Sequence, residues 1–337
     1  MVNEAPWLRI GSMIGGRYDI RSHLGSGGMG VVYEVVDRQS DEAIALKMLR
    51  RGNGDPQLIR REFRSLAGVT HPNLVQLYDL FDDEGVVYLT MELVRGKDLV
   101  SELCGDRSGA HDMTLPDSSG HQVGAAISQG SLPSATTLVN APPALDIPRI
   151  RERFLQLASG LYALHRCGLV HRDIKPQNVR VTDEGRVVIL DFGLATMAGL
   201  VGSVAGTVAY MAPEQSEGAP VRASGDWYSF GILVHEVLTG SSPWSGSSRD
   251  VLRRKQTEAV PLLQGRAGIP EDLAVLVDAL VRRNPEERPA GHESSNGSAA
   301  GLRGHADRRH AARSSLDSTP RWRGARSSVG ASSAISS

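Results

Sequence analysis

Two short segments of the sequence carry side chains that could hold a divalent cation beside a reacting hydroxyl group. The first contains Asp173, Lys175 and Asn178, and the second begins at Asp191, thirteen residues after Asn178. Carboxylate and amide oxygens are the hard ligands that Mg²⁺ prefers, and a separate carboxylate beside them could act as a base. This spacing is highly specific. It predicts a site for metal-assisted group transfer with a lysine beside the base.

A glycine-rich segment near the N-terminus could bind phosphate groups through its backbone amides. Its residues are Gly25, Ser26, Gly27, Gly28, Met29 and Gly30. Glycine lets phosphate oxygens approach the backbone, because no Cβ stands in the way. Dinucleotide-binding folds share the spacing G-x-G-x-x-G, but a helix follows their glycines, whereas the residues after Gly30 alternate in hydrophobicity like a strand. We therefore predict a hairpin loop over phosphate groups, with a plain glycine turn as the alternative.

Lys47 lies in a predicted apolar strand, where a charged side chain is costly unless it meets a partner. Glu62, on the helix predicted to follow, is the natural candidate. A Lys47–Glu62 ion pair would hold the ammonium group against phosphate oxygens and fix the position of the helix. The alternative is a lysine at a strand edge with a solvated tip.

The elements that must position these residues fall into two parts. Short runs of alternating hydrophobicity between 17 and 93 predict strands, and apolar residues at spacings of three and four predict one helix over 56–67. From Ile150 onward helical periodicity dominates. The sequence therefore predicts a sheet with a helix, followed by a mostly α-helical part.

Composition divides the chain further. We expect an N-terminal extension at 1–16, a first lobe at 17–95 and a second lobe at 96–289. The stretch 105–147 is rich in small and polar residues and shows no sustained period, so we expect an unstructured insertion. The Ser-, Arg- and Gly-rich tail at 290–337 should be unfolded for the same reason.

The overall composition excludes several classes of protein. The 337 residues hold 37 basic and 38 acidic side chains, a net charge of −1, so there is no reason to expect nucleic acid as an obligatory partner. The apolar runs are too short to span a membrane, and the N-terminus does not look like a secretory signal. Cys104 and Cys167 are far apart, which favours a reducing cytoplasm.

Taken together, these motifs resemble the eukaryotic-type (Hanks-type) protein kinase family, in its bacterial serine/threonine branch, over residues 17–289. The resemblance implies an α+β fold of two lobes, with a small β-rich N-terminal lobe that has one key helix and a larger α-helical lobe. It also implies ATP and Mg²⁺ as cofactors, and serine or threonine hydroxyls of proteins as acceptors. We expect autophosphorylation through a transient homodimer.

The same resemblance implies a role for each matching residue. Asp173 would be the base that orients the substrate hydroxyl, Lys175 would stabilise the transferring phosphoryl group, and Asn178 and Asp191 would bind the metal. Lys175 also points to Ser/Thr specificity, because tyrosine kinases usually have another residue near that position. Beyond the glycine-rich loop, the implied nucleotide-binding residues are Val32, Ala45, Lys47, Met91, Glu92 and Val94. The implied structural residues are Asp226, which would anchor the catalytic loop, and Glu214 and Arg288, which would form an ion pair.

Regulation is implied by Arg172, which precedes the base and in this family usually binds a phosphate on the activation segment. Ser203 is the best candidate for that phosphate, and Thr196 is the second candidate. Thr207 is expected to have a structural role instead, because in the family a threonine here bridges the catalytic aspartate and lysine.

Two other functions remain as alternatives. A small-molecule phosphotransferase of kinase-like fold could share the loop, the lysine and the metal-binding residues. We do not expect it to match the segment that runs from Thr207 to Glu214. A catalytically silent scaffold of the same fold would be expected to lack part of the catalytic set, which is complete here.

Overall fold

The computed structural model describes residues 8–27, 30–50, 56–83, 85–105, 145–191, 207–219 and 222–289. Several expectations lie outside these ranges. They concern the first seven residues, nearly all of the insertion, the tail, and the sites Gly28, Met29, Thr196 and Ser203.

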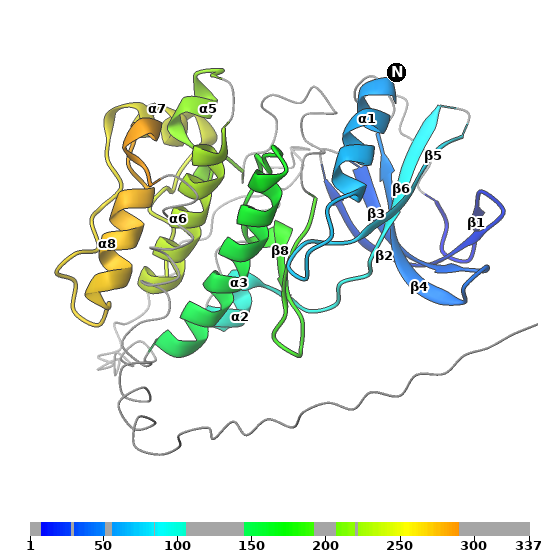
Figure 1. Cartoon of the computed structure of the whole chain (residues 1–337), viewed down its shortest axis with the longest axis horizontal. Helices are drawn as coiled ribbons and strands as arrows, with labels where there is room; N and C mark the ends of the chain where they lie inside the picture. Colours follow the sequence, from blue (N-terminus) through cyan, green and yellow to red (C-terminus); the bar gives the residue numbers. More distant parts are fainter. Residues whose placement is uncertain are drawn as a thin grey trace, which may run out of the picture.

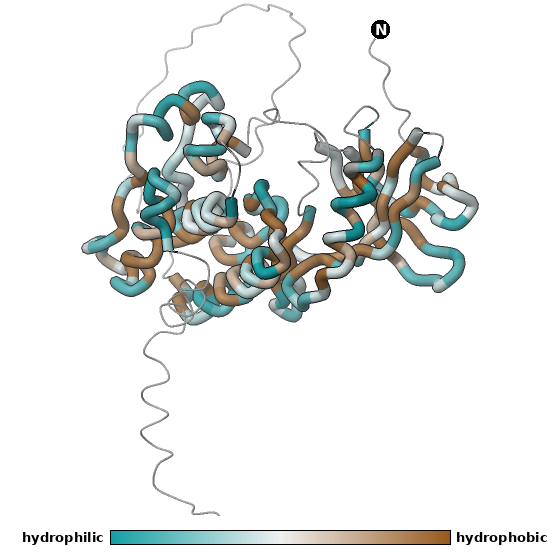
Figure 2. Tube along the Cα trace, turned by 45° about the horizontal axis from the view of Figure 1, so that its top comes forward, coloured by the Kyte–Doolittle hydropathy of each residue, from teal (hydrophilic) through white to brown (hydrophobic). Residues whose placement is uncertain are grey.

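The first part of the chain is an antiparallel sheet with the strand order β1-β2-β3-β4-β6-β5 (Figure 1). Its strands are β1 (Met13–Ile14), β2 (Tyr18–Gly27), β3 (Gly30–Asp37), β4 (Glu42–Leu49), β5 (Leu77–Asp83) and β6 (Val86–Met91). Along β3 the alternate side chains of Tyr33, Val35 and Asp37 are buried, which is the period of two expected of a strand with one face on a core. Figure 2 shows that the strands are mostly hydrophobic and the outer turns hydrophilic.

The helix predicted at 56–67 is present as α1 (Pro56–Ala67). Ile59, Phe63 and Leu66 are buried, at spacings of four and three that place them on one face of the helix. This face packs into the same hydrophobic core as β4, β5 and β6. Packing therefore fixes the position of α1 relative to the sheet.

The second part is mostly helical, with a small sheet in the order β7-β8-β9. The strands are β7 (Lys97–Asp98), β8 (Val179–Val181) and β9 (Val187–Ile189). The helices are α2 (Leu99–Cys104), α3 (Ile147–Arg166), α5 (Pro213–Ser216), α6 (Ala223–Thr239), α7 (Ser248–Thr257) and α8 (Glu271–Leu280), with short 3₁₀ turns η1 (Pro176–Asn178), η2 (Thr207–Ala209) and η3 (Pro285–Glu287). The side chains of α6 are buried along nearly its whole length, so this helix is the centre of the second part.

Main-chain pairing joins the two parts. Val75 N donates to Ile189 O at 3.0 Å, and Ile189 N donates to Asn73 O at 2.9 Å. Gly160 on α3 lets this segment approach closely, since a Cβ added there would lie 2.9 Å from Asn73 O. The β9 strand, which leads to Asp191, is therefore tied directly to the first part.

The architecture confirms the predicted α+β fold of two lobes. One boundary differs from the expectation. Helix α3 begins at Ile147, three residues before the predicted start at Ile150 and inside the range 105–147. Asp146 caps it by accepting a hydrogen bond from Arg149 N, and Pro148 suits the first turn, so local capping extends the helix into a stretch whose composition had predicted no structure.

Among the described residues, no helix combines the length and apolar character needed to cross a bilayer.

Candidate active site

Asp173, Lys175 and Asn178 converge on one carboxylate. Lys175 Nζ lies 2.7 Å from Asp173 Oδ2, and Asn178 Nδ2 donates to the same oxygen at 3.0 Å and to the Asp173 carbonyl at 2.8 Å. The other carboxylate oxygen, Oδ1, is buried and accepts no hydrogen bond from the described residues. Asp173 thus has one oxygen held by its neighbours and one that accepts no hydrogen bond from the described residues.

Asp226 on α6 fixes the backbone of this loop. Its carboxylate accepts hydrogen bonds from His171 N and Arg172 N, both at 2.7 Å, and lies 2.7 Å from His165 Nε2. Burial acts to raise the pKa of Asp226, but the hydrogen bond and charge of His165 and the contacts from His171 outweigh it and hold the pKa below its usual value. Arg172 has φ 72°, a strained value for a non-glycine residue, which these bonds stabilise.

His171 joins the loop to the strand end that carries Asp191. Its Nδ1 accepts a hydrogen bond from Asp173 N at 3.3 Å, and its Nε2 lies 2.8 Å from Leu190 O. Leu190 N in turn donates to Asn178 O at 2.8 Å. The expected base and the two expected metal ligands therefore lie on adjoining segments that are hydrogen-bonded to each other.

Lys47 is paired with Asp191, with 2.8 Å between Nζ and Oδ2, and its side chain is only 3% exposed. Burial acts to raise the pKa of Asp191, but the charge and hydrogen bond of Lys47 hold it below the usual range. The backbone of Asp191 has φ 55°. Lys47 therefore meets the partner that its burial requires, but from an unexpected segment.

The expected Lys47–Glu62 ion pair is not formed within the described residues, where Lys47 pairs with Asp191 alone. Burial raises the pKa of Glu62, and the charges that oppose this shift belong to Arg172 and Arg61. The expectation was wrong for this conformation, in which Asp191 already neutralises the buried ammonium group.

The glycine-rich segment is a hairpin, as predicted. Gly27 is paired with Gly30, and Gly25 with Val32, on either side of the turn between β2 and β3. Gly30 has φ 156°, and a Cβ there would lie 2.0 Å from Met48 O, so only glycine fits against β4. The hairpin therefore leads directly into β3, which pairs with β4, the strand that carries Lys47.

The other expected nucleotide-binding residues are brought together by strand register. Val32 faces Lys47 across β3 and β4, and Ala45 faces Met91 across β4 and β6. Met91 and Ala45 are both buried in the core, while Val94 is partly buried against it. Val32, Ala45 and Met91 thus lie on neighbouring strands of the sheet, and Val94 follows shortly after β6 in the chain.

Glu92, at the connection between the two parts, is held at both its backbone and its side chain. Its N–H donates to Gln76 O at 2.9 Å, and its carboxylate lies 2.6 Å from Arg186 Nη2. Arg186 Nε also donates to Pro72 O at 2.9 Å. The side chain of Glu92 thus stiffens the connection.

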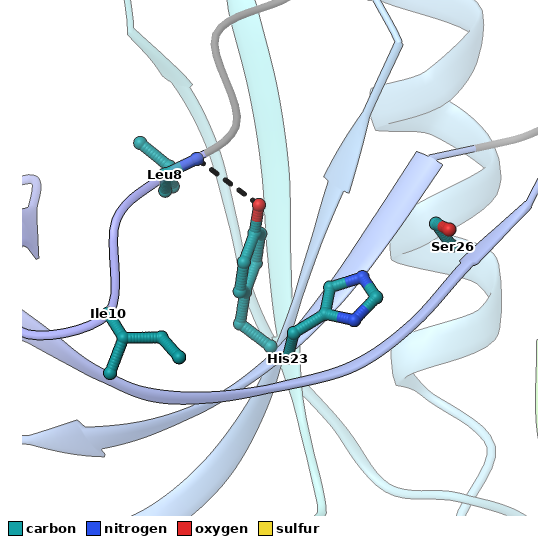
Figure 3. A pocket seen from close by; sticks show the side chains of 5 residues that line it. Leu8, Ile10, His23 and Ser26 are labelled. Carbon is teal, nitrogen blue, oxygen red and sulfur yellow. Dashed lines mark hydrogen bonds between the residues drawn. The ribbon is translucent and has the colours of Figure 1, made fainter.

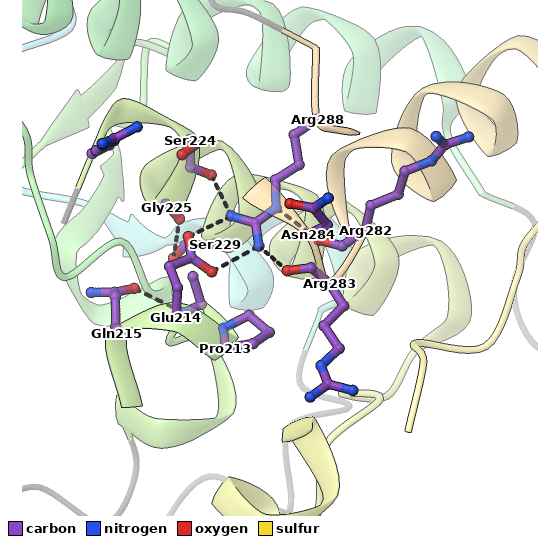
Figure 4. A network of polar contacts seen from close by, with 12 residues as sticks. Pro213, Glu214, Gln215, Ser224, Gly225, Ser229, Arg282, Arg283, Asn284 and Arg288 are labelled. Carbon is purple, nitrogen blue, oxygen red and sulfur yellow. Dashed lines mark hydrogen bonds and ion pairs between the residues drawn. The ribbon is translucent and has the colours of Figure 1, made fainter. Parts of the chain in front are cut away.

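Arg288 and Glu214 form a bidentate ion pair, with distances of 2.6 and 2.8 Å (Figure 4). The guanidinium group also donates to the carbonyls of Ser224, Arg282 and Arg283. The Arg288 side chain is fully buried. This network locks the end of the 207–214 segment to the second part of the chain.

The described structure also contains a hollow away from these residues, on the outer face of β2 and β3. It has a volume of about 350 Å³ and is lined by Leu8, Ile10, His23, Ser26 and Tyr33. Figure 3 shows Leu8 N donating to the tyrosine hydroxyl, at 3.2 Å. Of the expected site residues, only Ser26 reaches it, so it is not part of the catalytic arrangement.

Sequence reasoning missed several residues that hold the site together. His165 supports Asp226, Arg186 binds Glu92, and Lys255 and Ser229 bind carbonyls of the 209–211 segment. Only His165 had a local signal, as a histidine in the last turn of a predicted helix. The side chain of Thr207 is outside the described structure, so its expected bridge to Asp173 and Lys175 stays a prediction.

Comparison of the sequence with those of known proteins identifies the relatives of this chain. Residues 18–297 match the protein kinase domain. The probable serine/threonine-protein kinase pknA2 of Bifidobacterium longum is 34% identical over 291 residues, which cover 82% of this chain and 34% of that protein. Serine/threonine-protein kinase PknL of Mycobacterium tuberculosis is 32% identical over 290 residues, covering 83% of this chain and 64% of that protein.

Serine/threonine-protein kinase PrkC of Bacillus subtilis is 30% identical over 292 residues, which cover 83% of this chain and 40% of that protein. The matches thus extend over most of this chain, but the chain spans between about a third and just under two thirds of the length of these three curated relatives.

Proposed function

We propose a function for this chain from the premise that it belongs to the protein kinase family, and within it to the serine/threonine protein kinases. It transfers the γ-phosphoryl group of ATP to serine and threonine hydroxyls of proteins. The observation that carries the proposal is the buried Oδ1 of Asp173, which accepts no hydrogen bond from the described residues while Lys175 holds the other oxygen of the same carboxylate.

Asp173 acts as the base. Its Oδ1 accepts the proton of the substrate hydroxyl while the hydroxyl oxygen bonds to the γ-phosphorus and the bond between that phosphorus and the β,γ-bridging oxygen breaks. The electron pair of the broken bond leaves with ADP. Lys175, at 2.7 Å from the other carboxylate oxygen, orients Asp173 and brings a positive charge to the transferring group.

The residues present fit Mg²⁺. Asp191 is held in its ionised form, and Asn178 keeps its amide oxygen for a ligand because its nitrogen is bonded to Asp173. The ion would be held by one carboxylate, an amide oxygen and the nucleotide phosphates. When bound, Mg²⁺ would neutralise part of the negative charge of the phosphate groups.

The nucleotide lies between the hairpin and the catalytic loop. Backbone amides of the glycine-rich hairpin bind the phosphates, and Lys47 on the adjacent strand supplies a cation at the same place. The adenine lies against Ala45, Met91 and the chain at Glu92 and Val94. Register supports this arrangement, since Ala45 and Met91 are paired.

Autophosphorylation is part of the proposal. Arg172, beside the base, would bind a phosphate at Ser203 or Thr196, both outside the described residues. A transient homodimer would bring one chain's activation segment to the other's site. We place this activity in the cytoplasm, as expected from two cysteines that are far apart in the sequence.

One assay separates this function from its alternatives. Purified full-length chain is incubated with Mg²⁺, radiolabelled ATP and dephosphorylated casein, and phosphoserine and phosphothreonine are quantified. Label on protein, lost in Asp173→Asn, supports the proposal. Label transferred only to small molecules would favour a small-molecule phosphotransferase, and nucleotide binding without any transfer would favour a silent scaffold. The buried Glu214–Arg288 pair argues against a small-molecule phosphotransferase, which is not expected to match the segment that this pair closes. The complete catalytic set argues against a silent scaffold.

A further inference from the structure

Helix α7 ends in two side chains that bind carbonyls of the segment leading into α5. Lys255 Nζ donates to Ala209 O at 2.8 Å and to Met211 O at 2.5 Å. The next residue, Gln256, donates from Nε2 to Pro213 O at 3.1 Å. Three alternate carbonyls are thus held from the α7 side.

The carbonyl between the first two is held from the other side. Ser229 Oγ on α6 lies 2.9 Å from Tyr210 O. Ala209, Tyr210 and Met211 therefore each have their carbonyl oxygen bound by a side chain of α6 or α7. We call Lys255, Gln256 and Ser229 the carbonyl clamp.

The setting of Lys255 is unusual for a lysine. It is 1% exposed, and its Nζ lies 5.2 Å from the ring centre of Tyr228 and 5.4 Å from that of Trp244. Burial lowers its pKa to about 6, opposed by the charge of Glu214. A methionine could fill the same space without the cost of desolvating an amine. Packing alone therefore does not explain an amine here, whereas its two bonds to carbonyls do.

The clamped segment reaches the catalytic loop. Gln215 Nε2 lies 3.3 Å from Arg172 O, next to Asp173, and the Glu214–Arg288 pair fixes the segment's far end. The clamp fixes the part between these points and η2. A protein substrate must place its hydroxyl against Asp173 Oδ1 within a few tenths of an ångström, and a fixed surface beside the base reduces the freedom that docking would have to remove.

We propose that Lys255 is a positioning residue for the protein substrate: through the carbonyl clamp it holds 209–213 as a rigid surface on which the substrate chain docks beside Asp173. This rests on the proposed function. By this proposal, helix α7 helps to position the protein substrate and takes no part in ATP binding.

The test compares Lys255→Met with Arg254→Met in the full-length chain. Arg254 is the preceding residue on the same helix, and its ion pair with Glu258 is solvent-exposed. We expect kcat/KM for casein to fall by about 10- to 100-fold in Lys255→Met, while KM for ATP, measured at saturating casein, stays within about twofold. Arg254→Met should match the parent on both measures. Equal losses for casein and ATP would mean a merely structural role and would overturn the proposal.

Hydrogen exchange provides a readout that does not depend on activity. Amides of 207–216 should exchange faster in Lys255→Met than in the parent, and those around Lys47 should not. Ser229→Ala removes the bond from the opposite helix with little change in volume, so it should act in the same direction even if Lys255→Met does not fold. Unchanged exchange and unchanged casein kinetics in Ser229→Ala would refute the clamp. If the parent transfers no phosphate to any protein, the proposed function fails, and faster exchange would then retain the clamp as a structural device only.

Discussion

Lys47 Nζ and Asp191 Oδ2 are 2.8 Å apart, so the cation expected to hold phosphate and the carboxylate expected to hold Mg²⁺ neutralise each other in this conformation. Glu62, the expected partner of Lys47, instead lies within the electrostatic reach of Arg172. Bound nucleotide and metal would compete for both members of the Lys47–Asp191 pair.

Loss of either central charge should abolish transfer without unfolding the chain. We expect Asp173→Asn to lower kcat by about 10²- to 10⁴-fold, because the proton of the hydroxyl loses its acceptor. Lys47→Met should weaken ATP use to a similar extent. Lys97→Met, at an exposed lysine on β7, is the matched control and should behave like the parent. Substantial radiolabel incorporation by Asp173→Asn would contradict the assignment of the base.

Comparison of the parent with Glu62→Gln should show that folding disfavours ionisation of the Glu62 carboxyl group. The pKa of Glu62 is raised in the folded chain, so its favourable contribution is complete below the ordinary glutamate pKa and is lost as pH rises through the raised value. The parent should therefore lose stability relative to Glu62→Gln as the pH rises above the ordinary glutamate pKa of 4.5. Melting temperatures measured as a function of pH test this, and a constant difference would rule it out.

Glu214→Gln should strongly destabilise the second part of the chain. It leaves the fully buried guanidinium of Arg288 without its counter-charge, at a cost of about 3 kcal/mol. The control is Glu286→Gln, which breaks the exposed pair with Arg222, where both side chains are about three-quarters exposed. Urea unfolding should separate the two variants clearly. Equal urea midpoints for the two variants would show that the buried Glu214–Arg288 pair stabilises the fold no more than the exposed Glu286–Arg222 pair does.

Lys255 should make the free energy of unfolding increase as the pH rises. Its pKa in the folded chain, about 6, lies below that of a free lysine, so the unfolded state binds more protons between the two values. The groups that face it are Glu214 and Tyr228, with Arg288 stacked on the same tyrosine ring. Stability should rise with pH from about 6 upward, by at most about 1.4 kcal/mol per pH unit.

The control for that measurement is Lys255→Met, which removes the titrating group and should flatten the dependence between pH 7 and pH 9. A parent and variant with parallel pH profiles would show that Lys255 stays charged in the folded chain.

Incubation with Mg²⁺ and ATP should modify Ser203. A phosphate there adds about −1.5 to −2 charges, which Arg172 can meet. Mass spectrometry of the parent should find this site, and the Asp173→Asn chain should lack it. A Ser203→Ala chain as active as the parent would remove the regulatory role, with Thr196 as the next site to examine.

Much of this molecule follows from local patterns in the sequence. The hairpin after the glycine-rich loop follows from period-two hydrophobicity beyond Gly30, and α1 follows from its apolar face, because both depend on residues close in the chain. The contacts among Asp173, Lys175 and Asn178 are also local, since a segment of six residues contains all three. The start of α3 was predicted three residues too late, because the composition of 105–147 was given more weight than the capping residue Asp146.

Tertiary structure alone decided which distant groups meet. The sequence could offer Lys47 several carboxylates, but only the pairing of β9 with the segment at Asn73 and Val75 brings Asp191 to it instead of Glu62. Likewise Lys255 sits in a helix of mostly polar residues, where a solvated lysine would be expected, and only packing against α6 and the 209–213 segment buries it. Periodicity records which side of an element faces the core, whereas the partner of a buried charge depends on how separate elements pack.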